Sequence, residues 1–151
     1  MKLLKRIGLA ILVVLVGIQF VSTRTNQSSE VSSADFMPTF KVPEEIERIL
    51  HTSCYNCHSN NTNYPWYSHV QPVGWLLENH IEKGKAELNF SEFGSYSVRK
   101  QKSKLTSMVN QIEKDEMPLS SYTLIHREAR LTPESKKILV DYLNALRDSL
   151  Q

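Results

Sequence analysis

Apolar positions form two kinds of pattern in this chain, one unbroken run near its start and several helical stripes after it. The run, Ile7–Val21, is fifteen residues without a charge, and Lys2, Lys5 and Arg6 precede it. A basic start followed by an apolar core is the layout of a secretory signal or signal anchor. Residues 1–21 are therefore predicted to be such a segment. The bulky residues at its end favour an uncleaved transmembrane helix over a cleaved peptide.

Four later segments carry apolar residues at the spacing of one helix face. Helices are predicted from Pro43 into Cys54, over Pro72–Lys83, over Ser97–Lys114 and from Thr132 to near the C-terminus. Their apolar stripes are Ile46, Ile49 and Leu50; Val73, Leu76, Leu77, His80 and Ile81; Leu105, Met108, Val109 and Ile112; and Ile138, Leu139, Tyr142, Leu143, Leu146 and Leu150. Because no strand pattern competes, the fold class is predicted to be all-α, with about four helices after the N-terminal one.

Particular residues predict where these helices begin and end. Pro43 suits a first helical turn, and Gly84 is expected to end the second helix. Thr132 followed by Pro133 is typical of a helix start. The polar stretches 59–71 and 115–130 are interpreted as loops, because each lacks helical spacing and contains a proline.

Composition divides the chain further. Residues 22–40 are rich in serine and threonine and have no apolar periodicity, so they are interpreted as a flexible tether. The domain proper is then expected to span residues 41–151.

Net charge argues against one class of partner. The chain has 18 Lys+Arg and 16 Asp+Glu, and removing the three cations of the N-terminal segment leaves 15 against 16. A nearly neutral domain lacks the basic excess of a nucleic-acid binder. The run Arg99, Lys100, Lys102 and Lys104 is interpreted as a solvated helix face.

The candidate chemistry lies in the stretch SCYNCHSNN, residues 53–61. It contains the only two cysteines of the chain, Cys54 and Cys57, and His58 directly follows them. C-x-x-C-H is the attachment motif of c-type haem. The two thiols can form thioethers with the two vinyl groups of a porphyrin, and the histidine becomes the proximal ligand of the iron. The sequence therefore predicts one covalently attached haem c.

Other interpretations of the two cysteines are weaker. A thioredoxin-like dithiol needs a helix that starts at the pair after a strand, whereas here the predicted helix precedes it. Structural zinc needs four ligands, and His69, His80 or His126 would have to supply the remainder at spacings unlike those of standard sites. A disulfide between cysteines two residues apart would close a very small loop.

The sixth ligand of the iron has several candidates. Met117 is favoured, because it ends an acidic turn and precedes Pro118, which restrains the loop. His126 is the runner-up. The other candidates are Met108 and His80, which fall on apolar stripes and are expected to be core residues, His69 in the first polar loop, and Met37 in the predicted tether.

Aromatic residues gather after the attachment motif. Tyr64, Trp66, Tyr67 and Trp75 lie within a short stretch. Large flat side chains can cover the faces and edges of a haem, so these residues are candidates for the pocket, with ordinary core and rim positions as the alternative.

The motif and its surroundings resemble a known family. The run from CYNCHSNNTNYPWYSHVQPVGWLLENHIEKGKAELNFSEF to EMPLSSYTLIHREARLTPES is similar to the bacterial haem-binding domain family with a single C-x-x-C-H, a distant relative of class I cytochromes c. The resemblance covers roughly residues 38–148. It implies a cytochrome c-like fold, haem c at Cys54, Cys57 and His58, and Met117 as the distal ligand. The asparagine-rich SNNTN after His58 departs from ordinary class I cytochromes.

These observations lead to a functional expectation. Relatives joined to cytochrome c or di-haem peroxidase modules imply redox partner proteins of a respiratory or peroxidase chain. We expect an electron-transfer haem protein rather than an enzyme, held at the bacterial inner membrane by its N-terminal segment, with the domain facing the periplasm, or released there if that segment is cleaved. The alternative is a haem enzyme or sensor whose open distal site takes peroxide or a diatomic gas.

Overall fold

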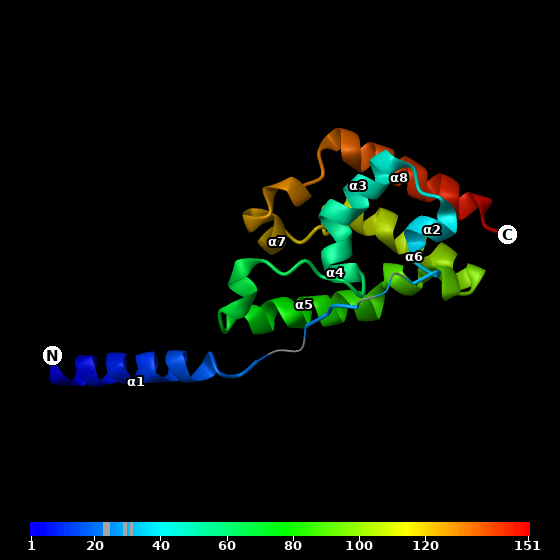
Figure 1. Cartoon of the computed structure of the whole chain (residues 1–151). Coiled ribbons are helices and arrows are strands. Elements are labelled where there is room, and N and C mark those ends of the chain that lie inside the picture. The colour runs from blue at the N-terminus through cyan, green and yellow to red at the C-terminus, as the bar shows by residue number, and fades with distance from the viewer. Residues whose placement is uncertain (23–24, 29, 31) are drawn as a thin grey trace.

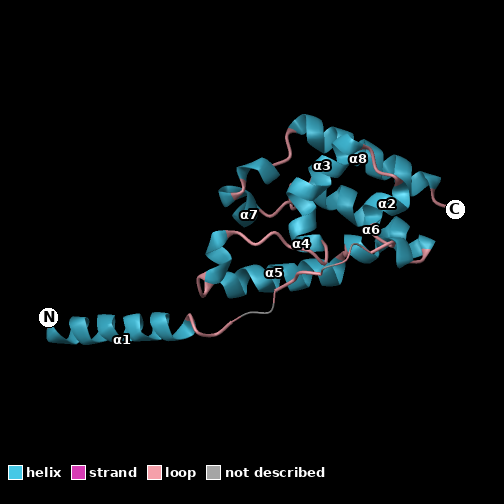
Figure 2. Ribbon diagram, in the orientation of Figure 1, coloured by secondary structure: helices cyan, strands magenta, loops and turns pink. Residues whose placement is uncertain are grey.

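The structure is a computed structural model, and it describes residues 1–22, 25–28, 30 and 32–151. Figure 2 shows helices joined by loops, with no ribbon drawn as a strand in this part of the chain. The all-α prediction is therefore confirmed. The helices are α1 (Lys2–Ile18), α2 (Phe36–Phe40), α3 (Glu44–Leu50), η1 (His51–Tyr55), α4 (Asn56–His58), η2 (Trp66–His69), α5 (Val73–Glu87), η3 (Phe90–Ser95), α6 (Val98–Glu113), α7 (Ser120–Ile125), η4 (Arg127–Ala129) and α8 (Pro133–Ser149).

The core lies where α3, α6 and α8 meet the segment around η3 (Figure 1). Its buried apolar members are Phe36, Ile46, Leu50, Tyr55, Phe90, Phe93, Leu105, Met108, Val109, Ile112, Leu139 and Leu143. The predicted stripes of α3, α6 and α8 all face this core, with their remaining members half-buried around it. Helical spacing was sufficient here because each helix buries one continuous face.

The start of α8 also agrees with its prediction. The Thr132 hydroxyl accepts a hydrogen bond from the Ser135 N–H at 3.1 Å, while the Ser135 hydroxyl accepts one from the Thr132 N–H at 2.9 Å. Pro133 occupies the first helical position. This reciprocal cap satisfies amide groups that a helix start leaves without partners.

The predicted stripe of α5 is wrong in part. Val73 and Leu76 are exposed, whereas Gly74 and Ile81 are buried. Gly84 does not end the helix, which continues to Glu87. The reason is that α5 turns its glycines toward its neighbours, since a Cβ at Gly74 would lie only 3.0 Å from the Gln71 side chain and closer still to the Ser68 carbonyl oxygen.

The two stretches interpreted as loops contain short helices. η2 lies within residues 59–71, and α7 and η4 lie within 115–130. None of these helices exceeds six residues. A helix that short is too brief to display a repeating apolar stripe, so periodicity does not detect it.

The segment interpreted as a tether differs most from expectation. Phe36 is fully buried among aromatic rings, and the Asp35 carboxylate accepts hydrogen bonds from the Tyr55 hydroxyl at 2.8 Å and the Met37 N–H at 3.0 Å. Nearer the N-terminus, the Asn26 carbonyl accepts from the Thr62 N–H at 2.9 Å. Within the described part of residues 22–40, the chain therefore packs against the domain. Thr23, Arg24, Ser29 and Val31 lie outside the described residues.

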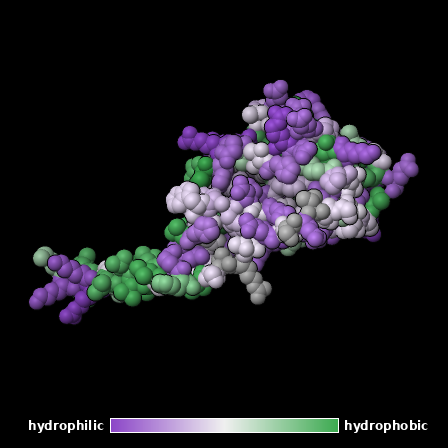
Figure 3. Space-filling model, in the orientation of Figure 1, coloured by the Kyte–Doolittle hydropathy of each residue, from purple (hydrophilic) through white to green (hydrophobic). Residues whose placement is uncertain are grey.

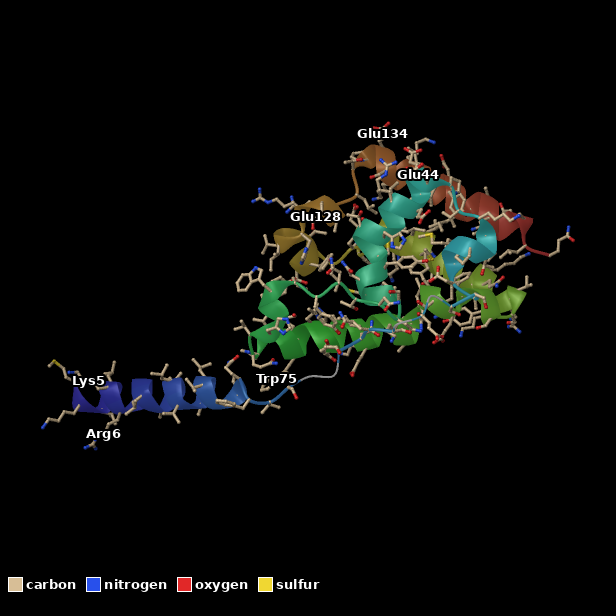
Figure 4. All side chains as sticks on the ribbon, viewed as in Figure 1. Lys5, Arg6, Glu44, Trp75, Glu128 and Glu134 are labelled. Carbon is tan, nitrogen blue, oxygen red and sulfur yellow. The ribbon has the colours of Figure 1, made fainter. Side chains whose placement is uncertain are left out.

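The N-terminal helix stands apart from the rest. α1 has no buried residue and forms an apolar rod beside a largely polar face of the domain (Figure 3). Lys5 and Arg6 project from its far end (Figure 4). Among the described residues, we find no helix that combines the length and apolar character required to cross a membrane. The prediction of a transmembrane helix is thus not supported.

Candidate functional site

One continuous helical stretch carries the motif. α3, η1 and α4 follow one another without a break from Glu44 to His58, and η1 is a π-helical turn that contains Cys54. π turns occur frequently at functional sites. Cys57 and His58 come three and four residues after Cys54, the spacing that places side chains on one face of a helix.

Two adjoining cavities open on this face. The first, of about 240 Å³, is lined by Cys54, and the second, of about 360 Å³, by Cys57. Five residues line both cavities: Ser53, His58, Glu87, Met117 and Pro118. Each thiol therefore borders its own half of a divided pocket, and the imidazole and the Met117 side chain border both halves.

Backbone contacts determine how the His58 ring is protonated. Its Nδ1 lies 2.9 Å from the Gly84 carbonyl oxygen and 3.1 Å from that of Leu88. Because a carbonyl oxygen can only accept, Nδ1 carries the proton. In the neutral ring Nε2 then keeps its lone pair for a metal. Burial lowers the pKa of His58, against a smaller opposing effect of the two carbonyls, and so favours this neutral form.

Gly84 permits this contact between helices. A Cβ at this position would lie 2.9 Å from the Cys57 carbonyl oxygen and 3.4 Å from Cε1 of His58. Only a residue without a side chain lets α5 approach α4 closely enough for the carbonyls of Gly84 and Leu88 to reach the imidazole. The glycine that the sequence suggested as a helix end is therefore a packing residue of the site.

The two thiols are half-buried and only weakly acidic. Burial, and to a lesser degree the neighbouring Cys57, raises the pKa of Cys54 to about 12, and burial raises the pKa of Cys57. A dithiol redox site needs the opposite shift, because the thiolate is its nucleophile. The thioredoxin-like interpretation therefore finds no support in the electrostatics of the site.

Met117 lies on a short loop after α6. Its N–H, like that of Glu116, donates to the Gln111 carbonyl oxygen, at 3.2 Å and 2.9 Å respectively. Asp115 adopts a left-handed conformation with φ of 58°, which turns the chain out of the helix. The half-buried Met117 side chain then lines both cavities.

The other ligand candidates lie in different places. Met108 is a core residue at the edge of the first cavity, and His80 borders only the second. His126 lines neither cavity; its Nε2 is 2.7 Å from the Tyr67 hydroxyl and its Nδ1 is 3.2 Å from Glu128. His69 is exposed on η2, and Met37 borders a separate cavity behind the motif helix.

The zinc interpretation also lacks a geometric basis. In the ranges that the structure describes, no three side chains of histidine, cysteine, aspartate or glutamate gather in a way that could hold a metal ion. A structural zinc site needs four ligands in a closed shell.

The aromatic cluster does not form the pocket wall that the sequence suggested. Tyr64, Trp66, Tyr67 and Trp75 line neither cavity. Trp66 is 80% exposed, and the Tyr64 hydroxyl accepts from the Asn26 N–H at 2.6 Å. The aromatic residues at the pocket are instead Phe90 and Tyr122, which come from η3 and α7.

Several residues of the pocket were not found by sequence reasoning. They are Ser53, Lys83, Glu87, Leu88, Phe90, Lys104, Ser107, Gln111, Leu119 and Tyr122. Most lie within a few residues of a predicted stripe or of Met117, but no motif distinguishes them. α5 and α6 lie close to the helical stretch Glu44–His58, which carries the motif, because of tertiary packing. Residue spacing within one segment cannot predict such packing.

Comparison with known proteins identifies the family. A model of the haem-binding domain family matches residues 13–145, which is most of the chain. The chain belongs to the haem-binding domain family. No curated protein and no solved structure matches it. This haem-binding domain includes residues of the segment interpreted as a tether, in agreement with the packing of Asp35 and Phe36.

The pocket of this haem-binding domain fits a haem in its donor set. It offers two free thiols on one helical face, an imidazole whose Nδ1 is occupied by carbonyls, and a thioether that borders the same space. Apolar walls come from Leu88, Phe90 and Ile112. Side chains of these kinds could hold a haem.

Proposed function

We propose that this haem-binding domain carries one covalently attached haem c and transfers single electrons to and from redox proteins outside the cytoplasmic membrane. Cys54 and Cys57 would hold the porphyrin, His58 would be the proximal ligand and Met117 the distal ligand of the iron. The observation that carries the proposal is the His58 imidazole, whose Nδ1–H is bound by two backbone carbonyls beside two free thiols.

Covalent attachment is supported by the two thiols, each of which borders one cavity. In the attachment reaction each sulfur bonds to one vinyl carbon and its proton goes to the other carbon, so no electron is gained or lost. Burial keeps both thiols protonated at neutral pH.

Electron transfer is supported by the apolar walls of the pocket and by the fixed orientation of the His58 ring. The haem, when bound, supplies an iron that cycles between two oxidation states. The protein then has to hold the ligands, exclude water and leave an edge accessible. Leu88, Phe90 and Ile112 exclude water on one side, and the two carbonyls fix the imidazole. Ligation by histidine and methionine raises the reduction potential of such a centre.

A location outside the cytoplasm is supported by the N-terminal residues. A basic start and an apolar core are features of export sequences. The partners we propose are redox proteins of a respiratory or peroxidase chain. Fractionation of cells that express the chain, followed by the mass of the mature protein, tests both export and cleavage.

The covalent haem is tested by expression in cells competent in cytochrome maturation. The denatured chain should keep its colour and gain the mass of one haem, whereas Cys54→Ala with Cys57→Ala should lose the covalent pigment. A colourless wild-type chain of unmodified mass would contradict the proposal.

The distal ligand is tested with Met117→Leu, which removes the sulfur and keeps the apolar bulk. The wild-type protein should give a low-spin spectrum with the methionine-to-iron charge-transfer band, and the variant should become high-spin and bind cyanide or carbon monoxide at least tenfold faster. Met37→Leu, in the separate cavity, is the matched control. A high-spin wild-type protein would instead favour the enzyme or sensor with an open distal site.

A further inference from the structure

The charged residues at the pocket follow a simple pattern. Apart from histidines, those that line the two cavities in the described chain are Lys104 on α6, Lys83 on α5 and Glu87 on α5. Lys104 borders the first cavity, Lys83 the second, and Glu87 both. Each half of the pocket therefore has one ammonium group, and a single carboxylate lies between them.

Lys104 is paired with Glu87 only weakly, so its ammonium group can bind another carboxylate. Its side chain is only 25% exposed, while that of its ion-pair partner Glu87 is 84% exposed, and the nearest nitrogen and oxygen atoms are 3.6 Å apart. A long ion pair with one exposed member contributes little to stability. Lys104 can therefore exchange Glu87 for another carboxylate at small cost, because Glu87 can turn into water.

A haem carries two carboxylates, its propionates, on the edge away from the vinyl groups. Burying either carboxylate without a cationic partner would be costly. With Cys54 and Cys57 occupied by the vinyl edge, the propionates need donors that come from other elements. α5 and α6 supply one ammonium group each, and no arginine lines either cavity in the described chain.

We propose that Lys104 and Lys83 bind the two haem carboxylates. Before haem enters, Lys104 is paired with Glu87, and a haem carboxylate then replaces Glu87. This assignment rests on the proposed function, since it concerns the same pocket. Lys104 is the stronger contributor, because its side chain is more shielded from water than the exposed Lys83. The two lysines therefore select a porphyrin with free carboxylates and determine the orientation of its propionate edge.

Equilibrium binding tests this assignment without covalent attachment. The full chain with Cys54→Ala and Cys57→Ala is titrated with ferric protoporphyrin IX and, under the same conditions, with its dimethyl ester, which lacks both negative charges. The free acid should bind between about tenfold and about a hundredfold more tightly than the ester, since one fully effective charged contact is equivalent to about tenfold in affinity and Lys83 contributes less than Lys104. Binding is followed by absorbance.

Lysine variants locate the effect. Lys104→Met should weaken binding of the acid about tenfold and leave binding of the ester unchanged, and Lys83→Met should do the same to a smaller extent. Lys102→Met, on α6 but not at the pocket, is the matched control and should change neither. Glu87→Gln should strengthen binding of the acid, because it removes the competing carboxylate.

The mature protein provides an independent readout. Loss of the cation beside a propionate leaves more negative charge near the iron and favours the ferric state, so Lys104→Met should lower the reduction potential while Lys102→Met leaves it unchanged. Equal affinities for acid and ester, or equal losses of both in Lys104→Met, would overturn the carboxylate assignment alone. Failure of both porphyrins to bind would overturn the proposed function and this assignment with it.

Discussion

Two residues, His58 and Gly84, depend on each other at the site. The imidazole keeps its proton on Nδ1 because the carbonyl oxygens of Gly84 on α5 and of Leu88 directly after it lie within 3.1 Å. The end of α5 comes that close because position 84 has no side chain. A methyl group there would lie 2.9 Å from a backbone oxygen, which cannot move aside as the end of a flexible side chain could. The orientation of the His58 ring, the proposed proximal ligand, therefore depends on the absence of a side chain at position 84.

Gly84→Ala should therefore damage the site even though alanine is a better helix former. The gain in helix propensity is about 1 kcal/mol, and the cost of overpacking is about 1–3 kcal/mol. We expect a net fall in the free energy of unfolding, measured by urea denaturation, and a lower fraction of chains with covalent haem, measured by mass. Gly17→Ala, in α1 where nothing lies within 4 Å, should produce neither effect. Equal haem loading in both variants would contradict the packing role of Gly84.

At the scale of elements, the loop that carries Met117 is held from two sides. Backbone N–H groups of the loop donate to Gln111 on α6, and from α8 the Lys136 ammonium group donates to Asp115 at 2.7 Å and to the Glu113 carbonyl oxygen at 3.0 Å. Lys136 therefore ties the end of α6 to α8 directly before the proposed ligand. The position of the thioether depends on two helices that contribute no ligand themselves.

Lys136→Met should loosen this loop with little effect on overall stability. An exposed ion pair is equivalent to about 0–1 kcal/mol, so the free energy of unfolding should change by no more than that. The methionine-to-iron band of the mature protein should nevertheless disappear at a lower temperature than in the wild type. Lys137→Met removes the neighbouring pair with Asp141 on the same helix and is the matched control. Loss of the band at the same temperature in both variants would contradict a role of Lys136 in holding the Met117 loop.

At the scale of the whole molecule, the domain begins earlier than its composition suggests. The aromatic ring of Phe36 is 5.0 Å from that of Phe93 between centroids, and Asp35 is bound to Tyr55 on the motif helix. α2 is therefore part of the core that supports the site, although it precedes residue 41. In Figure 1 it lies among α3, α6 and α8, while α1 projects away from them.

Phe36→Ala should therefore destabilise the whole domain. Truncation of a buried phenylalanine costs about 3–5 kcal/mol, and Phe36 has no exposed surface. Phe20→Ala, at a side chain that is 85% exposed, should leave the free energy of unfolding unchanged. Both are measured by urea denaturation of the apoprotein. A loss below about 1 kcal/mol for Phe36→Ala would restore the interpretation of this segment as a tether.

The sequence allowed part of this structure to be predicted, for identifiable physical reasons. The motif at Cys54 and the stripes of α3, α6 and α8 are local, because their residues lie within a few turns of one another. The inward face of α5 was misassigned, because Val73 and Leu76 share helical spacing with Ile81 although only Ile81 is buried. Lys104 was interpreted as part of a solvated face, but it lines the first cavity. The sequence did not indicate this, because the position of Lys104 depends on how α6 packs against the rest of the fold.

The anchor of the His58 ring has a consequence for variation among related chains. Its two hydrogen-bond acceptors are main-chain oxygens, which every amino acid provides. Apart from Gly84, substitutions along α5 and at Leu88 can therefore accumulate without altering which nitrogen of His58 carries the proton. Homologues are therefore expected to resemble one another more closely in backbone conformation at this point than in amino-acid sequence.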